Sequence, residues 1–75
     1  MLSIDKTAGS FLYSQVVDLV GDQIEGGVLR PGDRLPSLRQ LSERLDVSVP
    51  TVRQAYIELE RQGRVESRPQ SGFYV

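Results

Sequence analysis

The feature that most constrains the fold is the pattern of residues 35–75. It consists of two short helical patterns separated by a tight turn, followed at once by a hairpin pattern. The first helix is expected to start at Ser37, because Gln40 three residues later completes a Ser-x-x-Gln capping box. Its core positions, spaced i, i+3 and i+7, are Leu38, Leu41 and Leu45. We expect this helix to end near Asp46, with Val47 as the apolar contact of the turn.

The second helical pattern begins at Ser48, with Pro50 in the first turn, where a missing backbone N–H costs nothing. Gly63 is expected to follow the end of this helix. Its apolar positions are Val52, Ala55, Tyr56 and Leu59, with Ile57 as a weaker candidate. A hairpin comes next, because residues 64–68 alternate, residues 69–72 have turn chemistry and residues 73–75 favour a strand.

A longer amphipathic helix of about four turns precedes this region, starting at Phe11 and capped at its C-terminal end by Gly26-Gly27. Its apolar positions are Leu12, Val16, Val17, Leu19, Val20 and Ile24. Val28 and Leu29 are expected to re-enter the core, before a turn at Pro31-Gly32-Asp33. Residues 1–10 show no period and are interpreted as a flexible N-terminal arm.

Three helices followed by a two-stranded hairpin predict an α+β fold, the winged helix-turn-helix, over residues 11–75. The helix-turn-helix would span about 38–57 and the β-hairpin wing about 64–75. In such folds one helix enters the DNA major groove and the wing lies beside it. The order of elements therefore predicts DNA binding.

The composition argues against catalysis and against a metal site. The 75 residues allow one small domain, and they include no cysteine and no histidine. No run approaches the roughly 20 apolar residues of a membrane-spanning helix. We therefore expect a cytoplasmic domain that is not an enzyme and has no cofactor in this chain. We also expect it to be part of a larger regulator, with an effector domain outside this chain.

The net charge of −1 is low for a nucleic-acid-binding domain. The distribution of charge favours the second half of the chain, because residues 33–75 hold seven basic residues, all of them arginine, and six acidic ones. Arginine is suited to bidentate contacts with phosphate and guanine. We expect weak DNA affinity from the isolated domain, and a protein-interaction module without DNA binding stays open as an alternative.

The candidate DNA-binding residues fall in two groups. Around the tight turn they are Arg39, Ser48, Val49, Thr51, Arg53 and Gln54, which combine hydroxyl donors with arginines near two helix N-termini. In the wing they are Arg68, Gln70, Ser71 and Gly72, with Gly72 expected at positive φ. Of all these residues, Arg53 is the strongest candidate for a contact with a base.

Two long motifs carry a resemblance to a known family. Residues 27–37, GVLRPGDRLPS, and the helix pattern from Val47 to Leu59 resemble the N-terminal winged-helix domain of GntR-type bacterial transcription regulators. The resemblance covers about residues 10–75, and residues 67–75 look most like the MocR-like branch. In that branch a linker joins the domain to an aminotransferase-like domain that binds pyridoxal 5′-phosphate. That cofactor would bind outside this chain.

By this resemblance, Arg39, Thr51 and Arg53 take the places of residues that contact phosphates and bases, and Ser48 that of a phosphate-contacting hydroxyl. Two departures stand out: many members have arginine in place of Val49 and glycine in place of Gln70. The resemblance also implies binding to double-stranded DNA as a homodimer of the full-length protein. The same module attached to a sugar- or fatty-acid-sensing domain is the nearest alternative.

Overall fold

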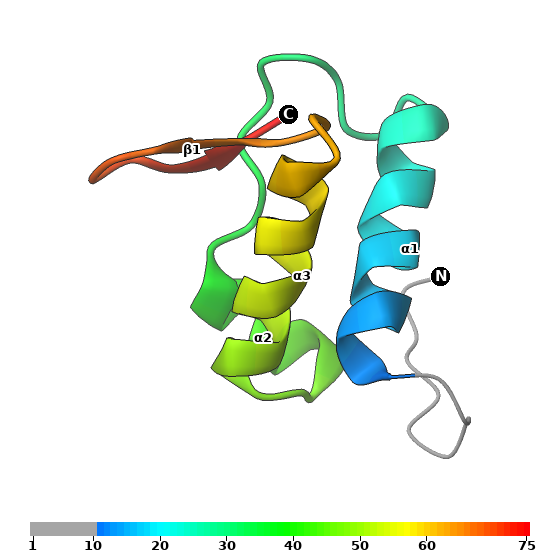
Figure 1. Cartoon of the computed structure of the whole chain (residues 1–75), viewed down its shortest axis with the longest axis vertical. Helices are drawn as coiled ribbons and strands as arrows, with labels where there is room; N and C mark the ends of the chain where they lie inside the picture. The colour runs from blue at the N-terminus through cyan, green and yellow to red at the C-terminus, as the bar shows by residue number, and fades with distance from the viewer. Residues whose placement is uncertain (1–10) are drawn as a thin grey trace.

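The computed structural model describes residues 11–75, which form three helices and a two-stranded antiparallel sheet (Figure 1). The helices are α1 (Leu12–Glu25), α2 (Leu38–Leu45) and α3 (Val49–Arg61), and the strands are β1 (Glu66–Arg68) and β2 (Gly72–Tyr74). This order confirms the predicted winged-helix fold. Residues 1–10, predicted to be an arm, lie outside the described residues.

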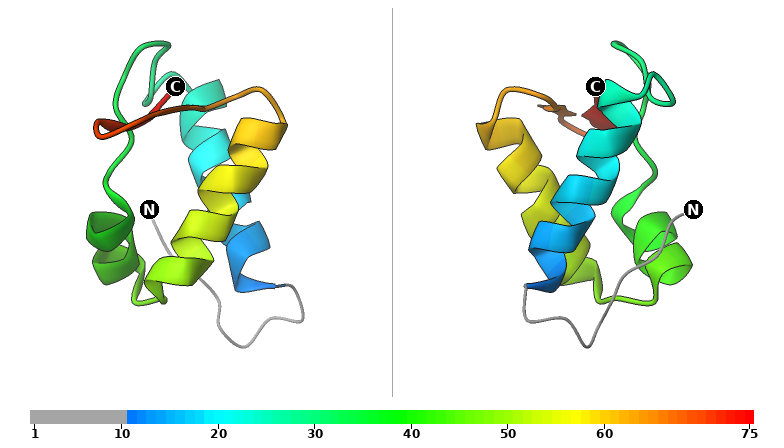
Figure 2. Two further views of the ribbon diagram at one scale, coloured as in Figure 1. Left: turned by 60° about the vertical axis from the view of Figure 1, so that its left-hand side comes forward. Right: turned by 90° about the vertical axis from the view of Figure 1, so that its right-hand side faces the viewer.

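Helix α3 is the centre of the domain, because it packs against both other helices. The hairpin begins near the C-terminal end of α3 and projects to the side on which α2 lies (Figure 1). The left view of Figure 2 shows the same relation, with the hairpin tip above α2. One side of the domain therefore carries α2, the start of α3 and the wing together.

The core is apolar and connects all three helices with the wing. Its buried members are Val16, Val17, Val20, Leu35, Leu41, Leu45, Val52, Ala55, Tyr56, Leu59 and Val65. The helical positions among them agree with the sequence prediction, whereas Leu35 and Val65 were not predicted. Both lie outside the helices, where too few residues alternate to reveal which face is buried.

Two predicted core positions are wrong. Ile57 is 49% exposed, because the buried stripe of α3 runs through Val52, Ala55, Tyr56 and Leu59 and leaves Ile57 on the other side. Val28 is 72% exposed, whereas Leu29 packs against the core as predicted. The cause lies in the helix end: the backbone N–H groups of both residues donate to the Gln23 carbonyl, which folds the chain back over α1 and leaves Val28 outside.

The helix ends follow local signals. Ser37 and Gln40 form both hydrogen bonds of the predicted capping box, each 3.0 Å long. After α1 and α3, Gly27 and Gly63 adopt φ near +79° and +78°. At both ends the next residue donates back across the last turn, which is the Schellman arrangement that favours glycine. These caps set the short turns that place α2 and the wing.

Tyr56 joins three parts of the domain. Its side chain is fully buried, its hydroxyl donates to the Pro36 carbonyl over 2.8 Å, and its ring packs edge-on against Phe73 at 5.1 Å. Burial raises the pKa of Tyr56, so the hydroxyl keeps the proton that it donates. Helix α3, the entry to α2 and the wing are thereby held in fixed relation.

The hairpin is paired on both sides of β2. On one side β1 pairs with β2 in the register Glu66 to Tyr74 and Arg68 to Gly72. On the other side Arg34 lies opposite Tyr74, with bonds of 2.8 Å from Leu35 N–H to the Phe73 carbonyl and from Val75 N–H to the Asp33 carbonyl. This extra pairing anchors the wing to the segment that leads into α2.

Candidate nucleic-acid interface

The N-terminal turn of α3 exposes a compact polar group. Ser48 is the N-cap, and its hydroxyl oxygen accepts from the Thr51 N–H over 3.2 Å. The two hydroxyl oxygens of these residues lie 2.8 Å apart. Because only one of the two protons bridges them, the other remains available to a ligand. The site thus offers a hydroxyl donor at the positive end of a helix dipole.

The other predicted residues of α3 lie on its outer surface. Arg53 and Gln54 are exposed, and Val49 is 39% exposed. Val49 and Arg53 are four residues apart and therefore share one face of the helix. This face presents an apolar contact beside a guanidinium group, a combination that suits a base edge with a thymine methyl.

Arg39 lies in the first turn of α2 and is exposed, as its place opposite the leucine stripe predicts. Like four other arginines within residues 11–75, it forms neither an ion pair nor a side-chain hydrogen bond. The complete set of these unpaired arginines is Arg30, Arg34, Arg39, Arg44 and Arg53. Four of the five belong to α2, α3 or the segment entering α2, and Arg30 lies in the turn after α1.

The remaining arginines are neutralised within the domain. Arg61 donates two hydrogen bonds to Glu58, and these bonds lower the pKa of the Glu58 carboxyl. Arg64 lies 3.1 Å from both the Glu25 carboxylate and the Gly21 carbonyl, so it links the start of the wing to α1. Positive charge without an internal partner is therefore concentrated around α2 and the start of α3.

In the wing, the predicted residues form two different environments. Arg68 donates to Glu66 over 2.7 Å and stacks on the Tyr74 ring, 4.1 Å from its centre. At the tip, Ser71 and Tyr74 share a hydrogen bond between their hydroxyl groups. Gly72 has the expected positive φ of 129°, and Gln70 is exposed with φ of 64°. Gln70 thus adopts a backbone conformation that favours glycine, the residue that the family resemblance places at this position in many members.

The structure separates the predicted residues into two groups on one side of the domain. The elements that carry the two groups, α2 with the start of α3 and the hairpin, lie on the same side of the domain in Figure 1. Sequence reasoning missed Arg34, which lies between the two groups, and Tyr74, which supports Arg68. The only sequence signal for Arg34 was a polar residue beside the apolar Leu35, which is too short a pattern to indicate a strand.

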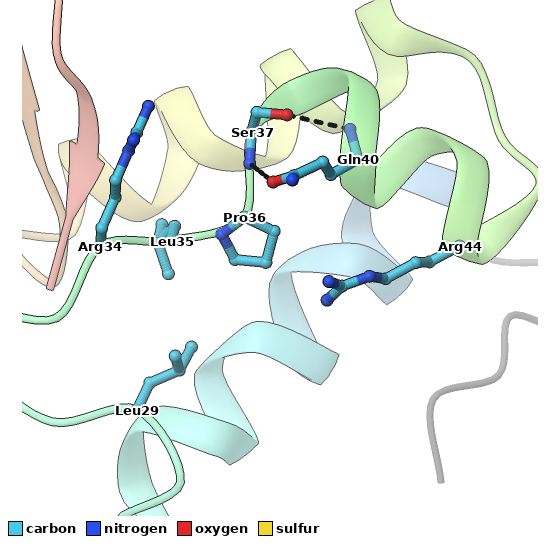
Figure 3. A pocket seen from close by; sticks show the side chains of 7 residues that line it. All are labelled: Leu29, Arg34, Leu35, Pro36, Ser37, Gln40 and Arg44. Atoms are coloured by element: carbon cyan, nitrogen blue, oxygen red, sulfur yellow. Dashed lines mark hydrogen bonds between the residues drawn. The ribbon is translucent and has the colours of Figure 1, made fainter.

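Within residues 11–75, no cluster of three or more acidic side chains could hold a metal ion. Nor is any helix of this part of the chain long and apolar enough to cross a membrane. The surface hollows are shallow and open. One of them is shown in Figure 3, where Leu29, Pro36 and the capping box lie between the side chains of Arg34 and Arg44.

The fold and the basic face define a winged-helix DNA-binding domain. Comparison with known proteins agrees: residues 12–75 match the family described as "Bacterial regulatory proteins, gntR family". The chain belongs to this GntR family. Membership in a family of regulators also agrees with the expectation that the chain is neither catalytic nor cofactor-dependent.

Two relatives illustrate the match. The uncharacterized HTH-type transcriptional regulator YdcR of Escherichia coli is 48% identical over 63 residues, which are 84% of this chain and 14% of YdcR. The HTH-type transcriptional repressor YtrA of Bacillus subtilis is 35% identical over 75 residues, which are 100% of this chain and 58% of YtrA. The chain therefore spans less than two thirds of either relative. The comparisons establish the family, and they do not support the finer assignment to the MocR-like branch.

A solved structure of AraR(DBD) in complex with operator ORX1 has the same fold, with a TM-score of 0.90 and 26% sequence identity. The alignment covers 100% of this chain and 95% of that one. This neighbour shows the same fold bound to its own operator.

Proposed function

We propose that this chain reads an operator half-site, with the start of α3 in the major groove and the wing against the adjacent minor groove. The observation that carries the proposal is the cluster of unpaired arginines on the side that bears α2, the start of α3 and the wing. An arginine with an internal carboxylate partner must give up that partner to bind phosphate, whereas Arg39 and Arg53 need not. The AraR domain, which has the same fold, is bound to an operator in its solved structure, and this supports DNA binding as the role of the fold.

The residues have distinct roles in this arrangement. Arg53, projecting from the exposed face of α3, reads a base edge, with guanine as the base that best matches a guanidinium fork. Arg39, at the start of α2, holds a phosphate or guanine. The free hydroxyl proton of the Ser48 and Thr51 pair reaches a phosphate, assisted by the helix dipole.

Two exposed side chains of α3 complete the major-groove contact. Val49 packs on a thymine methyl in place of the charged contact of many relatives, and Gln54 lies beside it on the same turns. The wing supplies Arg68, Gln70, Ser71 and Gly72 to the minor groove or the backbone beside it. The Tyr74 ring orients the Arg68 side chain by stacking, and Arg68 must release the Glu66 carboxylate to bind a phosphate.

The full-length regulator is proposed to be a cytoplasmic homodimer that binds paired half-sites of double-stranded DNA. Two linked domains raise the local concentration of the second after the first has bound, which offsets the weak affinity of one domain. The dimer contacts would lie mainly outside this chain.

The proposal extends to the effector domain of the full-length regulator. The resemblance of residues 67–75 to the MocR-like branch supports an aminotransferase-like domain with pyridoxal 5′-phosphate. The aligned segment is only 14% of YdcR, which is therefore long enough for a large additional domain. It is 58% of YtrA, which has room for a much smaller one. The coding sequence after Val75 decides between these types, and borohydride reduction followed by mass spectrometry would detect a lysine-bound cofactor.

The proposal is tested by selecting bound duplexes from a random pool at several salt concentrations, using the 75-residue chain alone and two copies joined by a flexible linker. We expect an enriched half-site and an affinity that falls steeply with salt, because phosphate contacts release counterions. Failure of the linked pair to enrich any sequence, with an affinity insensitive to salt, would favour the protein-interaction alternative.

A further inference from the structure

The outer face of the wing continues beyond the hairpin into the segment before α2. Arg34, in the segment bridged to β2, lies opposite Tyr74, which in turn lies opposite Glu66 on β1, so their side chains emerge on the same face. Leu35 and Phe73, their neighbours along the chain, point the other way into the core. Arg68 and Gly72 also belong to the outer face, because they are an opposed pair two residues from Glu66 and Tyr74.

Gly72 leaves room for Arg34 on this face. A Cβ at Gly72 would lie 3.1 Å from Nε and 3.4 Å from Nη2 of Arg34. The guanidinium group therefore lies beside the bare backbone near the wing tip, on the diagonal from its own position. Figure 3 shows the Arg34 side chain extending alongside the hairpin and away from Leu29.

Arg34 also lies next to the start of α2. It lines a shallow groove together with Ser37 and Leu38 on one side and Gln70 and Ser71 on the other. The side chain is exposed and has no carboxylate partner or side-chain hydrogen bond within residues 11–75. Arg34 therefore lies between the two groups of predicted DNA contacts, and its positive charge has no partner within residues 11–75.

We infer that Arg34 is a further DNA-contact residue, which binds a backbone phosphate between the segment read by α3 and the segment reached by the wing. This inference rests on the proposed function. A guanidinium group held beside a strand offers two parallel N–H donors in a fixed plane, which matches phosphate geometry. Gly72 would then serve two purposes: it allows the turn, and it leaves Arg34 uncovered.

The test compares Arg34→Ala with Arg30→Ala, which removes the same unpaired charge from the turn after α1. Affinities of the 75-residue chain are measured for the selected half-site and for an unrelated duplex over a range of salt. Arg34→Ala should weaken both about 10-fold and should lower the salt slope by about one. Arg30→Ala should change either affinity less than about 2-fold, because a distant exposed charge is screened.

A phosphate scan makes the test specific to a direct contact. Each phosphate around the half-site is replaced in turn by an uncharged methylphosphonate. For the unsubstituted chain, replacement should lower the affinity at several phosphates. For Arg34→Ala, replacement at one of these phosphates should no longer lower the affinity. Arg34→Gln, which keeps the aliphatic stem beside Gly72, should behave like Arg34→Ala if charge is what matters. Thermal unfolding of each variant shows whether the fold is retained.

The possible failures are distinguishable. Equal effects of Arg34→Ala and Arg30→Ala, or an unchanged phosphate scan, would overturn the role of Arg34. If Arg53→Ala then still reduces selectivity, the proposed function stands without Arg34. If the unsubstituted chain shows no salt-dependent affinity for any duplex, alone or linked in pairs, both the proposed function and the role of Arg34 are wrong.

Discussion

The arginines of this domain form two populations that differ in what they face. Arg61, Arg64 and Arg68 are paired with carboxylates and lie in the last turn of α3 and the wing. Arg34, Arg39, Arg44 and Arg53 have no such partner and lie around α2 and along α3. All of these residues are arginines, so the sequence alone does not separate them. The fold separates them by giving only some of them a carboxylate partner.

This difference bears on how a chain with a net charge of −1 can bind DNA through the proposed interface. Each internal ion pair contains one acidic and one basic side chain, so the pairs leave the net charge unchanged. In the proposed complex, DNA meets arginines that have no carboxylate partner within residues 11–75. Net charge alone is therefore a poor guide for a domain of this size, and the location of unpaired arginines is a better one.

The largest effect is expected from Arg53→Ala. Loss of a base contact should cost about 1–3 kcal/mol of binding free energy and relax the preference at one base pair, with little change in stability because the side chain is exposed. Competition between half-site duplexes that differ at single positions measures this. An unchanged preference at every position would exclude Arg53 as a base reader.

The paired population should behave in the opposite way. Arg64→Ala should lower the free energy of unfolding by about 1–2 kcal/mol, because it removes a bond to the Gly21 carbonyl and a partly exposed ion pair. Gly21→Ala should lower stability less than Arg64→Ala, because its Cβ would lie 2.7 Å from Nη1 at the movable end of the Arg64 side chain and alanine has the better helix propensity. Urea unfolding measures both, and DNA affinity of the folded protein should stay nearly constant.

A paired arginine near DNA can be converted into an unpaired one. Glu66→Gln removes the carboxylate partner of Arg68 and should raise DNA affinity about 2- to 5-fold, equivalent to roughly 0.5–1 kcal/mol. Glu58→Gln makes the same change beside Arg61, in the last turn of α3, and is the matched control. Equal gains from the two variants would mean that only overall charge matters and that Arg68 makes no contact.

The smallest effect concerns the wing tip. Gln70 has φ of 64°, a conformation that costs a non-glycine residue about 1–2 kcal/mol. Glycine avoids this steric cost, but it loses more conformational entropy on folding, which offsets part of the gain. Gln70→Gly should therefore stabilise the domain by about 0.5 kcal/mol, visible as a rise of a few degrees in Tm. A lower Tm would show that the Gln70 side chain stabilises the tip in a way the backbone angle does not indicate.

Features governed by neighbours in the sequence were predictable. The capping box at Ser37, the N-cap at Ser48 and the glycine after α3 depend on residues within one or two turns, and the structure shows each of them. The leucine spacing of α2 also placed Arg39 on the exposed side. Local chemistry and helical periodicity were therefore enough for the helices and for the position of most candidate contacts.

Features that depend on distant segments were not predictable. The pairing of Arg34 with Tyr74 joins residues 40 positions apart, and its strand is too short to show alternation. The burial of Leu35 follows from the same pairing. The division of the arginines into two populations was also invisible, because Arg64, in the turn after α3, meets Glu25 only when α3 packs against α1.

The most direct measurement is the salt dependence of DNA affinity for Arg39→Ala and Arg61→Ala beside the unsubstituted chain. Both changes remove one exposed positive charge, and only Arg39 lacks an internal partner. The slope of log affinity against log salt should become shallower by about one for Arg39→Ala and stay unchanged for Arg61→Ala. Equal shifts for the two variants would contradict the claim that the unpaired arginines around α2 and α3 make the phosphate contacts.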